Sequence, residues 1–419
     1  MNKVNLDLLI LFDDIRKNSV ITRVVKIFNE FFYKDYIVYM EADYYSVQRD
    51  IFFAVEEKDI IGSYWQSYVC KLVAESENKF SILSEKFIKN INTEKLMERE
   101  LTEIKKLYNL DWQTIINVFK DQQASIFFTE DTSLNKSGLL KRNQIKKALM
   151  INDNKQSLDL LYDYYSKWGC GIYEKYNAFV WDDKLVGVKN YDKITFDQLV
   201  GYEKQKEQLI ENTKFFINEY RSNNVLLYGD RGTGKSSSVK ALLNEFKDQK
   251  LKIISLNKNH IKDLYKIIEL VANRGCKFII FIDDLSFEET EVEYKYFKSV
   301  IEGGIEAQPD NVLIYVTSNR RNIIRETWKD RSNETGDVHH NDGIQERMSL
   351  ADRFGLLITF ISPDKKDYLE IVKKLAIQEG LRINETQLED EALKWELRHN
   401  GRSGRIAKQF IYYMKAKMI

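Results

Sequence analysis

The sequence is poor in proline and cysteine. Only Pro309 and Pro363 occur, and neither lies in the first three hundred residues, so long helices can run uninterrupted through the N-terminal half. The three cysteines, Cys70, Cys170 and Cys276, are odd in number and widely spaced. This spacing argues against a disulfide framework and suits reduced thiols.

Net charge and long apolar runs are also missing. The 64 lysines and arginines are matched by 64 aspartates and glutamates, so no global field favours nucleic acid or an anionic membrane, although a local basic patch stays open. The apolar run between Asp7 and Asp13 has only five residues, too few for a signal peptide or a membrane span. We therefore expect a soluble, cytoplasmic protein.

Residues 1–168 are expected to form a mainly α-helical domain. In INTEKLMERELTEIKKLYNL, residues 91–110, the apolar positions Met97, Leu101 and Ile104 fall on one helix face. The many tyrosines and phenylalanines of this part are interpreted as core packing, with a partner-binding surface as the alternative. Basic residues gather at Lys136, Lys141, Arg142, Lys146 and Lys147; a solvated helix face is preferred there over a nucleic-acid site.

The texture of the chain changes after residue 168. Residues 169–195 contain glycines, β-branched residues and aromatics, and they predict a hairpin-like connector. Short runs that are apolar throughout then alternate with helical stretches, which predicts an α/β domain over residues 196–363 with a five-stranded parallel sheet covered on both faces. The expected strands are Val225–Tyr228, Ile253–Leu256, Phe278–Ile282, Val312–Thr317 and Leu356–Phe360. Three short amphipathic helices over residues 364–419 suit a small lid.

The stretch GDRGTGKS, residues 229–236, fits G-x-x-x-x-G-K-[ST] and lies between an expected strand and an expected helix. Its glycines let backbone N–H groups point at phosphate oxygens, and the helix N-terminus adds partial positive charge. Lys235 would reach the β and γ phosphates of ATP, and Ser236 would hold Mg²⁺. A glycine-rich turn that binds nothing is the alternative. The expected nucleotide-binding residues here are Gly229, Asp230, Arg231, Gly232, Thr233, Gly234, Lys235, Ser236 and Ser237.

The apolar run KFIIFIDDLSFEE, residues 277–289, ends in two aspartates and has the form of a Walker B segment. Asp283 would bind the magnesium shell, and Asp284 would polarise the attacking water. Glu288, one turn further on, is an alternative base. A buried strand that ends in a helix-capping aspartate is the structural alternative.

Three further polar side chains follow later elements. Asn319 ends the run VLIYVTSNRR, where a neutral amide can orient the nucleophilic water. Arg353 precedes the last expected strand, and Arg405 falls in the first turn of the final helix. Arg320 and Arg321 compete with Arg353 as charge stabilisers. The order in which these residues follow Lys235 is stronger evidence for a nucleotide site than any one of them.

With these motifs, the chain from about residue 192 to its end resembles the AAA+ ATPases. The resemblance implies that Asn319 is sensor 1, Arg353 the arginine finger and Arg405 the sensor 2 arginine of the lid. In ITFDQLVGYEKQKEQLIENTKFFI it implies that Val200 and Gly201 border the adenine. More narrowly, LLYGDRGTGKSS, IDDLSFE, TSNRR and SLADRFGL are similar to the bacterial family known as domain of unknown function 815. That likeness implies a fold and an ATPase, and no substrate.

Two functions stay open. An arginine finger works only when a neighbour inserts it, so the resemblance implies a homo-oligomeric ring such as a hexamer, which would remodel a protein or nucleic-acid client. Most AAA+ members end Walker B in Asp-Glu, whereas this chain has Asp283-Asp284. The shorter second acid favours the alternative, a slow nucleotide switch or loader that controls the N-terminal helices. The polar insertion with His339, His340 and Asp342 is interpreted as a loop rather than a metal site.

Overall fold

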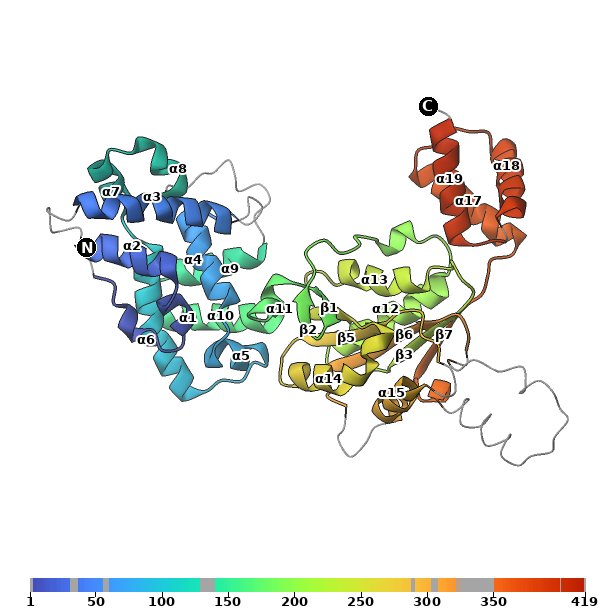
Figure 1. Ribbon diagram of the computed structural model, residues 1–419, viewed down its shortest axis with the longest axis horizontal. Helices are drawn as coiled ribbons and strands as arrows, with labels where there is room; N and C mark the ends of the chain where they lie inside the picture. The colour runs from blue at the N-terminus through green and yellow to red at the C-terminus, as the bar shows by residue number, and fades with distance from the viewer. Residues whose placement is uncertain are drawn as a thin grey trace. The chain divides into compact units, whose positions relative to one another are not determined.

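The computed structural model describes residues 3–30, 37–55, 60–128, 140–287, 291–302, 308–321, 323, 350–399 and 401–417. The chain divides into two compact units, Met1–Lys175 with Arg274–Cys276, and Tyr176–Asn273 with Lys277–Ile419 (Figure 1). In the described ranges, no helix is both long enough and apolar enough to cross a membrane.

The secondary structure described in the first unit is helical, and aromatic side chains fill its core. Trp112 stacks on Phe128 with ring centroids 3.8 Å apart, and the edges of Phe28 and Trp65 meet it at 4.9 and 5.3 Å. The expectation that the aromatics pack in a core is confirmed for these rings. The helices are α1 (Asp13–Arg16), α2 (Ser19–Glu30), α3 (Ile37–Ala54), α4 (Tyr64–Glu75), α5 (Lys79–Glu85), α6 (Ile91–Tyr108), α7 (Trp112–Phe119), α8 (Ser125–Phe128), α9 (Leu140–Met150), α10 (Asn154–Trp168) and α11 (Ile172–Lys175).

The basic stretch of α9 is only partly solvated, so the expected solvated face is wrong at two positions. Lys141 places its ammonium 2.7 Å from Glu174, and the Arg142 guanidinium lies 3.7 Å from the same carboxylate, with 5% of its side chain exposed. The Glu174 side chain is fully buried, and an unpaired buried carboxylate would be costly. Lys147 is exposed, as expected, and Lys136 lies outside the described residues.

A segment from far along the chain completes the first unit. Arg274 forks onto the buried Glu85 carboxylate with N–O distances of 2.6 and 3.0 Å, and its remaining nitrogen lies 2.8 Å from Glu77. The backbone N–H groups of Gly275 and Cys170 also donate to Glu85, at 3.0 and 2.9 Å. The Cys170 thiol donates to it as well, at 3.2 Å, so Glu85 has five donors, two of them from Arg274.

The second unit is built on a seven-stranded sheet in the order β2-β1-β4-β5-β6-β3-β7. All neighbours in it are parallel except β1 and β2. The strands are β1 (Ala178–Asp182), β2 (Lys184–Gly187), β3 (Val225–Gly229), β4 (Leu251–Ser255), β5 (Lys277–Ile282), β6 (Val312–Ser318) and β7 (Leu356–Phe360). The five expected strands are present as β3 to β7.

The prediction of a five-stranded sheet is wrong because the connector joins it. The hairpin of β1 and β2 extends the sheet, with Phe179 of β1 paired to Ile254 of β4. The connector was predicted to turn back on itself, which it does. Burial alternates along β1, as in a strand with one solvated face. A search for continuous apolar runs therefore does not identify this strand.

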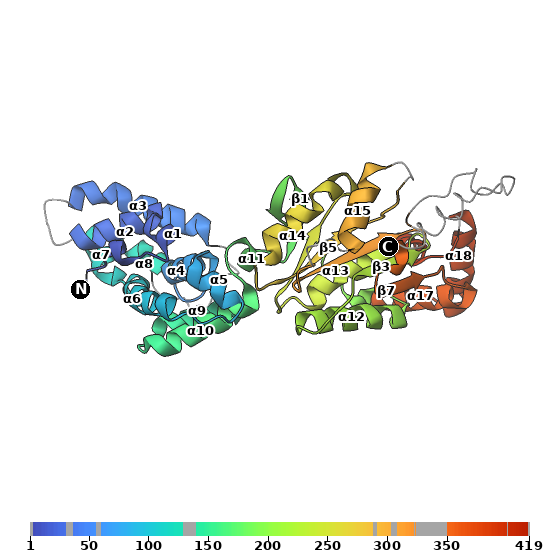
Figure 2. The ribbon, with the colours of Figure 1, turned by 90° about the horizontal axis from the view of Figure 1, so that it is seen from below.

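Helices cover both faces of this sheet, as the continuous apolar strands predict. Two views place α12 (Glu203–Ile217) and α13 (Lys235–Glu245) on one face and α14 (Leu264–Ala272) and α15 (Val292–Glu302) on the other (Figures 1 and 2). Successive residues of a strand face opposite sides of the sheet. Leu227 of β3 faces the side whose core is shared with α12 and α13.

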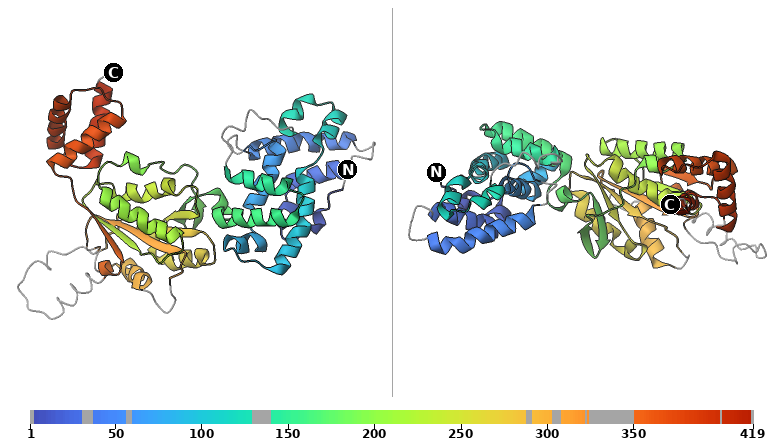
Figure 3. Two further views of the ribbon diagram at one scale, coloured as in Figure 1. Left: turned by 180° about the vertical axis from the view of Figure 1, so that it is seen from behind. Right: turned by 90° about the horizontal axis from the view of Figure 1, so that it is seen from above.

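The last three helices form a group with its own core (Figure 3). They are α17 (Lys365–Gln378), α18 (Glu385–Arg398) and α19 (Gly404–Lys417). Tyr368, Ala392 and Phe410, one from each helix, are buried together. These are the three amphipathic helices expected for the lid.

Candidate functional site

The site lies where three neighbouring strands end. In the sheet order β5-β6-β3, the carboxyl ends of these parallel strands lie side by side. The glycine-rich loop leaves β3, Asp283 and Asp284 follow β5, and Asn319 follows β6. Ligands of open parallel sheets bind at this edge. The sheet order therefore brings together motifs that are separated by up to 90 residues.

The loop after β3 is shaped by two close approaches. Gly229 has a φ of 130°, and a Cβ at this position would overlap the Phe360 carbonyl oxygen of β7. Gly232 has a φ of 78°, and a Cβ there would lie 2.9 Å from the Ser403 hydroxyl of the lid. The Arg405 N–H donates to the Gly232 carbonyl oxygen at 3.2 Å. Glycine is thus required at one position by the sheet and at the other by the lid.

Lys235 begins α13 and is 7% exposed. Its ammonium donates to the carbonyl oxygens of Gly229 and Asp230 at 2.9 and 2.7 Å. Burial lowers the pKa of Lys235, and the nearby carboxylates of Asp230, Asp284 and Asp283 oppose that effect. A cation that is partly desolvated and bonded to neutral oxygens is well suited to receive an anion.

Asp283 joins the loop to the ends of two strands. The hydroxyls of Ser236 and Thr317 both donate to its Oδ1, each at 2.5 Å. The Asp284 N–H in turn donates to the Thr317 hydroxyl at 2.8 Å. Thr317 is 1% exposed, and its hydroxyl oxygen forms hydrogen bonds with both aspartates. The sequence places Thr317 near the site but gives it no role; its position two residues before Asn319 was the available clue.

Asp284 and Asn319 are bonded to each other across the cavity edge. The Asn319 amide donates to Asp284 Oδ1 at 2.5 Å. Asp284 has a φ of 51°, in the left-handed region that is uncommon for residues other than glycine. Such a conformation is retained where the surroundings enforce it, and it is often found at functional sites. It directs this carboxylate to Asn319 while Asp283 faces Ser236.

A cavity of about 610 Å³ unites these groups with the lid. Its polar lining includes Arg231 to Ser237 of the loop, Asp283, Asp284, Thr317, Asn319 and Arg405. Val200 and Gly201 line it together with Phe360, Ile371 and Leu375, so part of the lining is apolar. Lys408, three residues after Arg405 on α19, also lines it. Sequence reasoning missed Lys408, although its spacing from Arg405 puts both on one helix face.

Some expected residues do not line this cavity. Gly229 and Asp230 act through their carbonyl groups on Lys235, and the Asp230 carboxylate accepts the Ser362 N–H at 2.7 Å, which lowers its pKa. Arg353 lies outside the cavity with 54% of its side chain exposed, and its nearest described acidic partner is Glu302 at 3.9 Å. Arg320 and Arg321 are also exposed and outside it. Glu288, His339, His340 and Asp342 lie outside the described residues.

The donor set fits a magnesium ion. Mg²⁺ prefers oxygen ligands and is usually held by one or two protein groups, substrate phosphates and water. Ser236 and Asp283 supply a hydroxyl and a carboxylate from facing elements, already within 2.5 Å of each other. No histidine or cysteine lines the cavity, so the described donors do not favour a softer metal.

Four features occur in the order found in the AAA+ ATPases, which this chain resembles. They are the glycine-rich loop, the two aspartates after β5, Asn319 and Arg405. The family model described as "Protein of unknown function (DUF815)" matches residues 174–418. This match covers more than half of the chain, which therefore belongs to that family.

Two further comparisons give more distant relatives. A "Putative 26S proteasome regulatory subunit homolog" of Methanocaldococcus jannaschii is 23% identical, over 53% of this chain and 68% of the relative. Among solved structures, the RuvB Holliday junction branch migration motor of Thermotoga maritima matches 53% of this chain at 20% identity and a TM-score of 0.37. A point mutant of that protein matches 55% at 20% identity with a TM-score of 0.38. This chain spans 63% and 67% of those two structures.

Proposed function

We propose that the chain is a Mg²⁺-dependent ATPase whose nucleotide occupies the 610 Å³ cavity. The observation that carries the proposal is the meeting of Lys235, Asp283, Asn319 and Arg405 at one cavity, from four separate motifs. The volume lies within the range for cofactor-sized ligands. The apolar part of the lining suits an adenine ring.

Each residue has a role that its contacts support. Lys235 and the N-terminus of α13 attract the phosphates, because both present positive charge to the cavity. Bound Mg²⁺, held by Ser236 and Asp283, would neutralise phosphate charge. Asp284 and Asn319, bonded at 2.5 Å, orient and polarise the attacking water. Arg405 and Lys408 bring positive charge from the lid.

Assembly follows from the position of Arg353. Its side chain is half exposed and lies outside the cavity of its own chain, which leaves it available to a neighbouring subunit and supports the proposal. We therefore propose that the chain forms a homo-oligomer in which Arg353 of one subunit reaches the nucleotide of the next. ATP hydrolysis would then drive remodelling of a protein or nucleic-acid client.

A slow nucleotide switch is the second candidate function. It is favoured by the Asp283-Asp284 ending and by the bond from Asn319 to Asp284, which occupies one oxygen of the proposed base. In that case nucleotide exchange, rather than rapid turnover, would control what the helical unit binds.

Turnover per subunit measured over a wide range of protein concentrations separates these functions. An assembled motor gives a rate per subunit that rises steeply with concentration and requires Mg²⁺. A switch gives a slow rate that does not change with concentration. Absence of ATP binding in both regimes would contradict the proposed function as a whole.

A further inference from the structure

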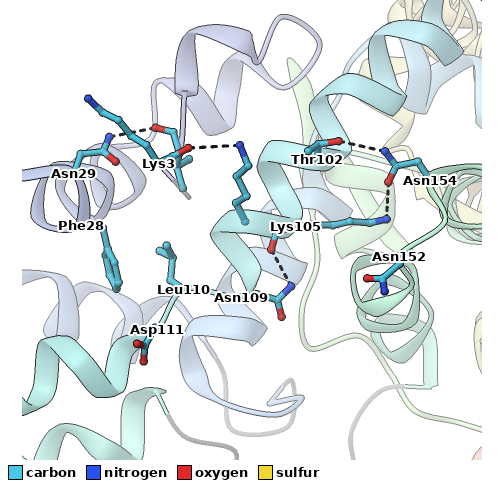
Figure 4. A pocket seen from close by; sticks show the side chains of 12 residues that line it. Lys3, Phe28, Asn29, Thr102, Lys105, Asn109, Leu110, Asp111, Asn152 and Asn154 are labelled. Atoms are coloured by element: carbon cyan, nitrogen blue, oxygen red, sulfur yellow. Dashed lines mark hydrogen bonds between the residues drawn. The ribbon is translucent and has the colours of Figure 1, made fainter. Parts of the chain in front are cut away.

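The helical unit contains a cavity of its own, distinct from the nucleotide cavity (Figure 4). Its volume is about 510 Å³, which is sufficient for a small organic molecule. It lies among the ends of α2, α6 and α10 and the turns that precede α7 and α10. The twelve lining residues are Lys3, Val4, Phe28, Asn29, Thr102, Lys105, Lys106, Asn109, Leu110, Asp111, Asn152 and Asn154.

Lys105 is the cation that gives this cavity its chemistry. Its ammonium donates to the Ile151 carbonyl oxygen at 2.6 Å and to Asn154 Oδ1 at 2.7 Å. Both acceptors are neutral, and no carboxylate of the described chain pairs with it within 4.0 Å. An ammonium has three donors, so one N–H is left for a further acceptor. Burial lowers the pKa of Lys105 and the charge of Asp153 opposes that effect, as a bound anion also would.

Two other charged residues of the lining, Asp111 and Lys106, have partners within the chain. Asp111 caps α7 and accepts the backbone N–H and the hydroxyl of Thr114 at 3.3 and 2.5 Å. Lys106 pairs with Glu103 at 2.7 Å. With Glu103 included, the three lysines Lys3, Lys105 and Lys106 stand against the two carboxylates Asp111 and Glu103, so the formal balance is positive by one charge.

Amides and apolar groups complete the lining. Figure 4 shows Lys105 reaching Asn154, which also donates to the Thr102 hydroxyl at 3.2 Å. In the described chain, the Asn152 amide makes no hydrogen bond with a protein group, although it lines the cavity. Phe28 and Leu110 lie on the other side, where they offer carbon surface.

We propose that this cavity binds a small organic anion that carries an apolar group. The anionic end, a carboxylate or a phosphate monoester, accepts hydrogen bonds from Lys105 and Asn152. The apolar end packs on Phe28 and Leu110. This inference does not depend on the proposed ATPase function.

Isothermal titration calorimetry of the full chain tests the proposal with phenyl phosphate and phenylacetate. Benzyl alcohol lacks the charge and inorganic phosphate lacks the ring, so each should bind at least about tenfold more weakly than the better anion. Lys105→Met should weaken binding of that anion at least about tenfold. Lys95→Met, at an exposed position of the same helix, should leave it unchanged. Tighter binding of phenyl phosphate or of phenylacetate assigns the anionic group.

Two more variants guard the interpretation. Asn152→Asp adds a repelling charge without removing a protein contact, so it decides the matter if Lys105→Met proves misfolded by circular dichroism. Lys235→Ala should leave binding intact, because it alters only the nucleotide cavity. The proposal is overturned if neither anion binds, if binding survives both Lys105→Met and Asn152→Asp, or if it is lost in Lys235→Ala.

Discussion

At the residue scale, Lys235 is the side chain on which ATP binding in the proposed nucleotide cavity should depend most. It is bonded only to the carbonyl oxygens of Gly229 and Asp230, and phosphate oxygens would be stronger partners because they carry charge. The motif made Lys235, Ser236 and Asp283 predictable, since their chemistry requires a fixed spacing from a strand end. The burial of Arg142 was not predictable, because its partner Glu174 lies 32 residues away on another element.

Lys235→Ala should weaken ATP binding by roughly ten- to a hundredfold, because charge-assisted hydrogen bonds contribute about 1.5–3 kcal/mol each. Calorimetric titration with Mg·ATP measures the change. Lys240→Ala, at an exposed position of the same helix, is the matched control and should bind as the unaltered chain does. Equal affinity in both variants would show that the loop is a turn that binds nothing.

Asp284→Asn should retain Mg·ATP and slow hydrolysis at least about tenfold, because it removes charge beside the water and leaves Asp283 on the metal. Steady-state phosphate release and nucleotide titration, carried out on the same preparation, separate the two effects. A larger loss in Glu288→Gln than in Asp284→Asn would move the base one turn further along the chain.

At the scale of elements, register explains why the two aspartates are so well placed. Ile282 of β5 pairs with Val316 of β6, so the next residues, Asp283 and Thr317, meet directly at the sheet edge. The five continuous apolar strands were predictable from their unbroken apolar runs, and β4, β5 and β6 are buried on both faces. The hairpin of β1 and β2 was predicted, but its place in the sheet was not, because its alternation is equally typical of a free connector and only its pairing with β4 shows that it belongs to the sheet.

Thr317→Val should lower turnover about tenfold while Mg·ATP still binds, because the aspartates lose the hydroxyl that positions both. Valine keeps the shape and β-branching of threonine. Ser318→Ala is the control on the same strand, since its hydroxyl donates to the Leu285 carbonyl and accepts the Arg320 N–H but bonds to neither aspartate. If the two variants reduce turnover equally, Thr317 acts through the stability of β6 and not by positioning the aspartates.

Arg274→Met should lower the free energy of unfolding by about 3 kcal/mol, because it leaves the buried Glu85 carboxylate without its cation. Urea unfolding followed by tryptophan fluorescence measures this change. Arg398→Met, at an exposed position of α18, should cost less than about 0.5 kcal/mol. A similar small loss in both variants would mean that the donors from Gly275 and Cys170 suffice for Glu85.

At the scale of the whole molecule, the position of Arg353 bears on how many chains make one active site. The cavity holds positive charge from Lys235, Arg405 and Lys408 of its own chain, and Arg353 is not among its lining residues. Neither the sequence motifs nor the fold identifies the macromolecule on which the chain would act, because the proposed ATP chemistry does not depend on that macromolecule.

Arg353→Ala should bind ATP normally and hydrolyse it on the order of a thousandfold more slowly, because its charge is needed only in the transition state. Mixing this variant with Lys235→Ala should restore part of the activity, since an intact loop can then face an intact arginine. Turnover of the mixture, with co-assembly checked by light scattering, measures the recovery. No recovery in a co-assembled mixture, or a greater loss in Arg321→Ala, would assign the finger elsewhere.

The place of Arg274–Cys276 in the first unit has a consequence for biosynthesis. Chains emerge from the ribosome with the N-terminal part first, so Glu85 and Cys170 are made long before the arginine that joins them. The ribosome must complete β3, β4 and α14 before that arginine appears. A nascent chain that ends at Lys175 therefore lacks the cation that pairs with Glu85, and the helical unit gains this ion pair only after residues 176–273 of the second unit have been translated.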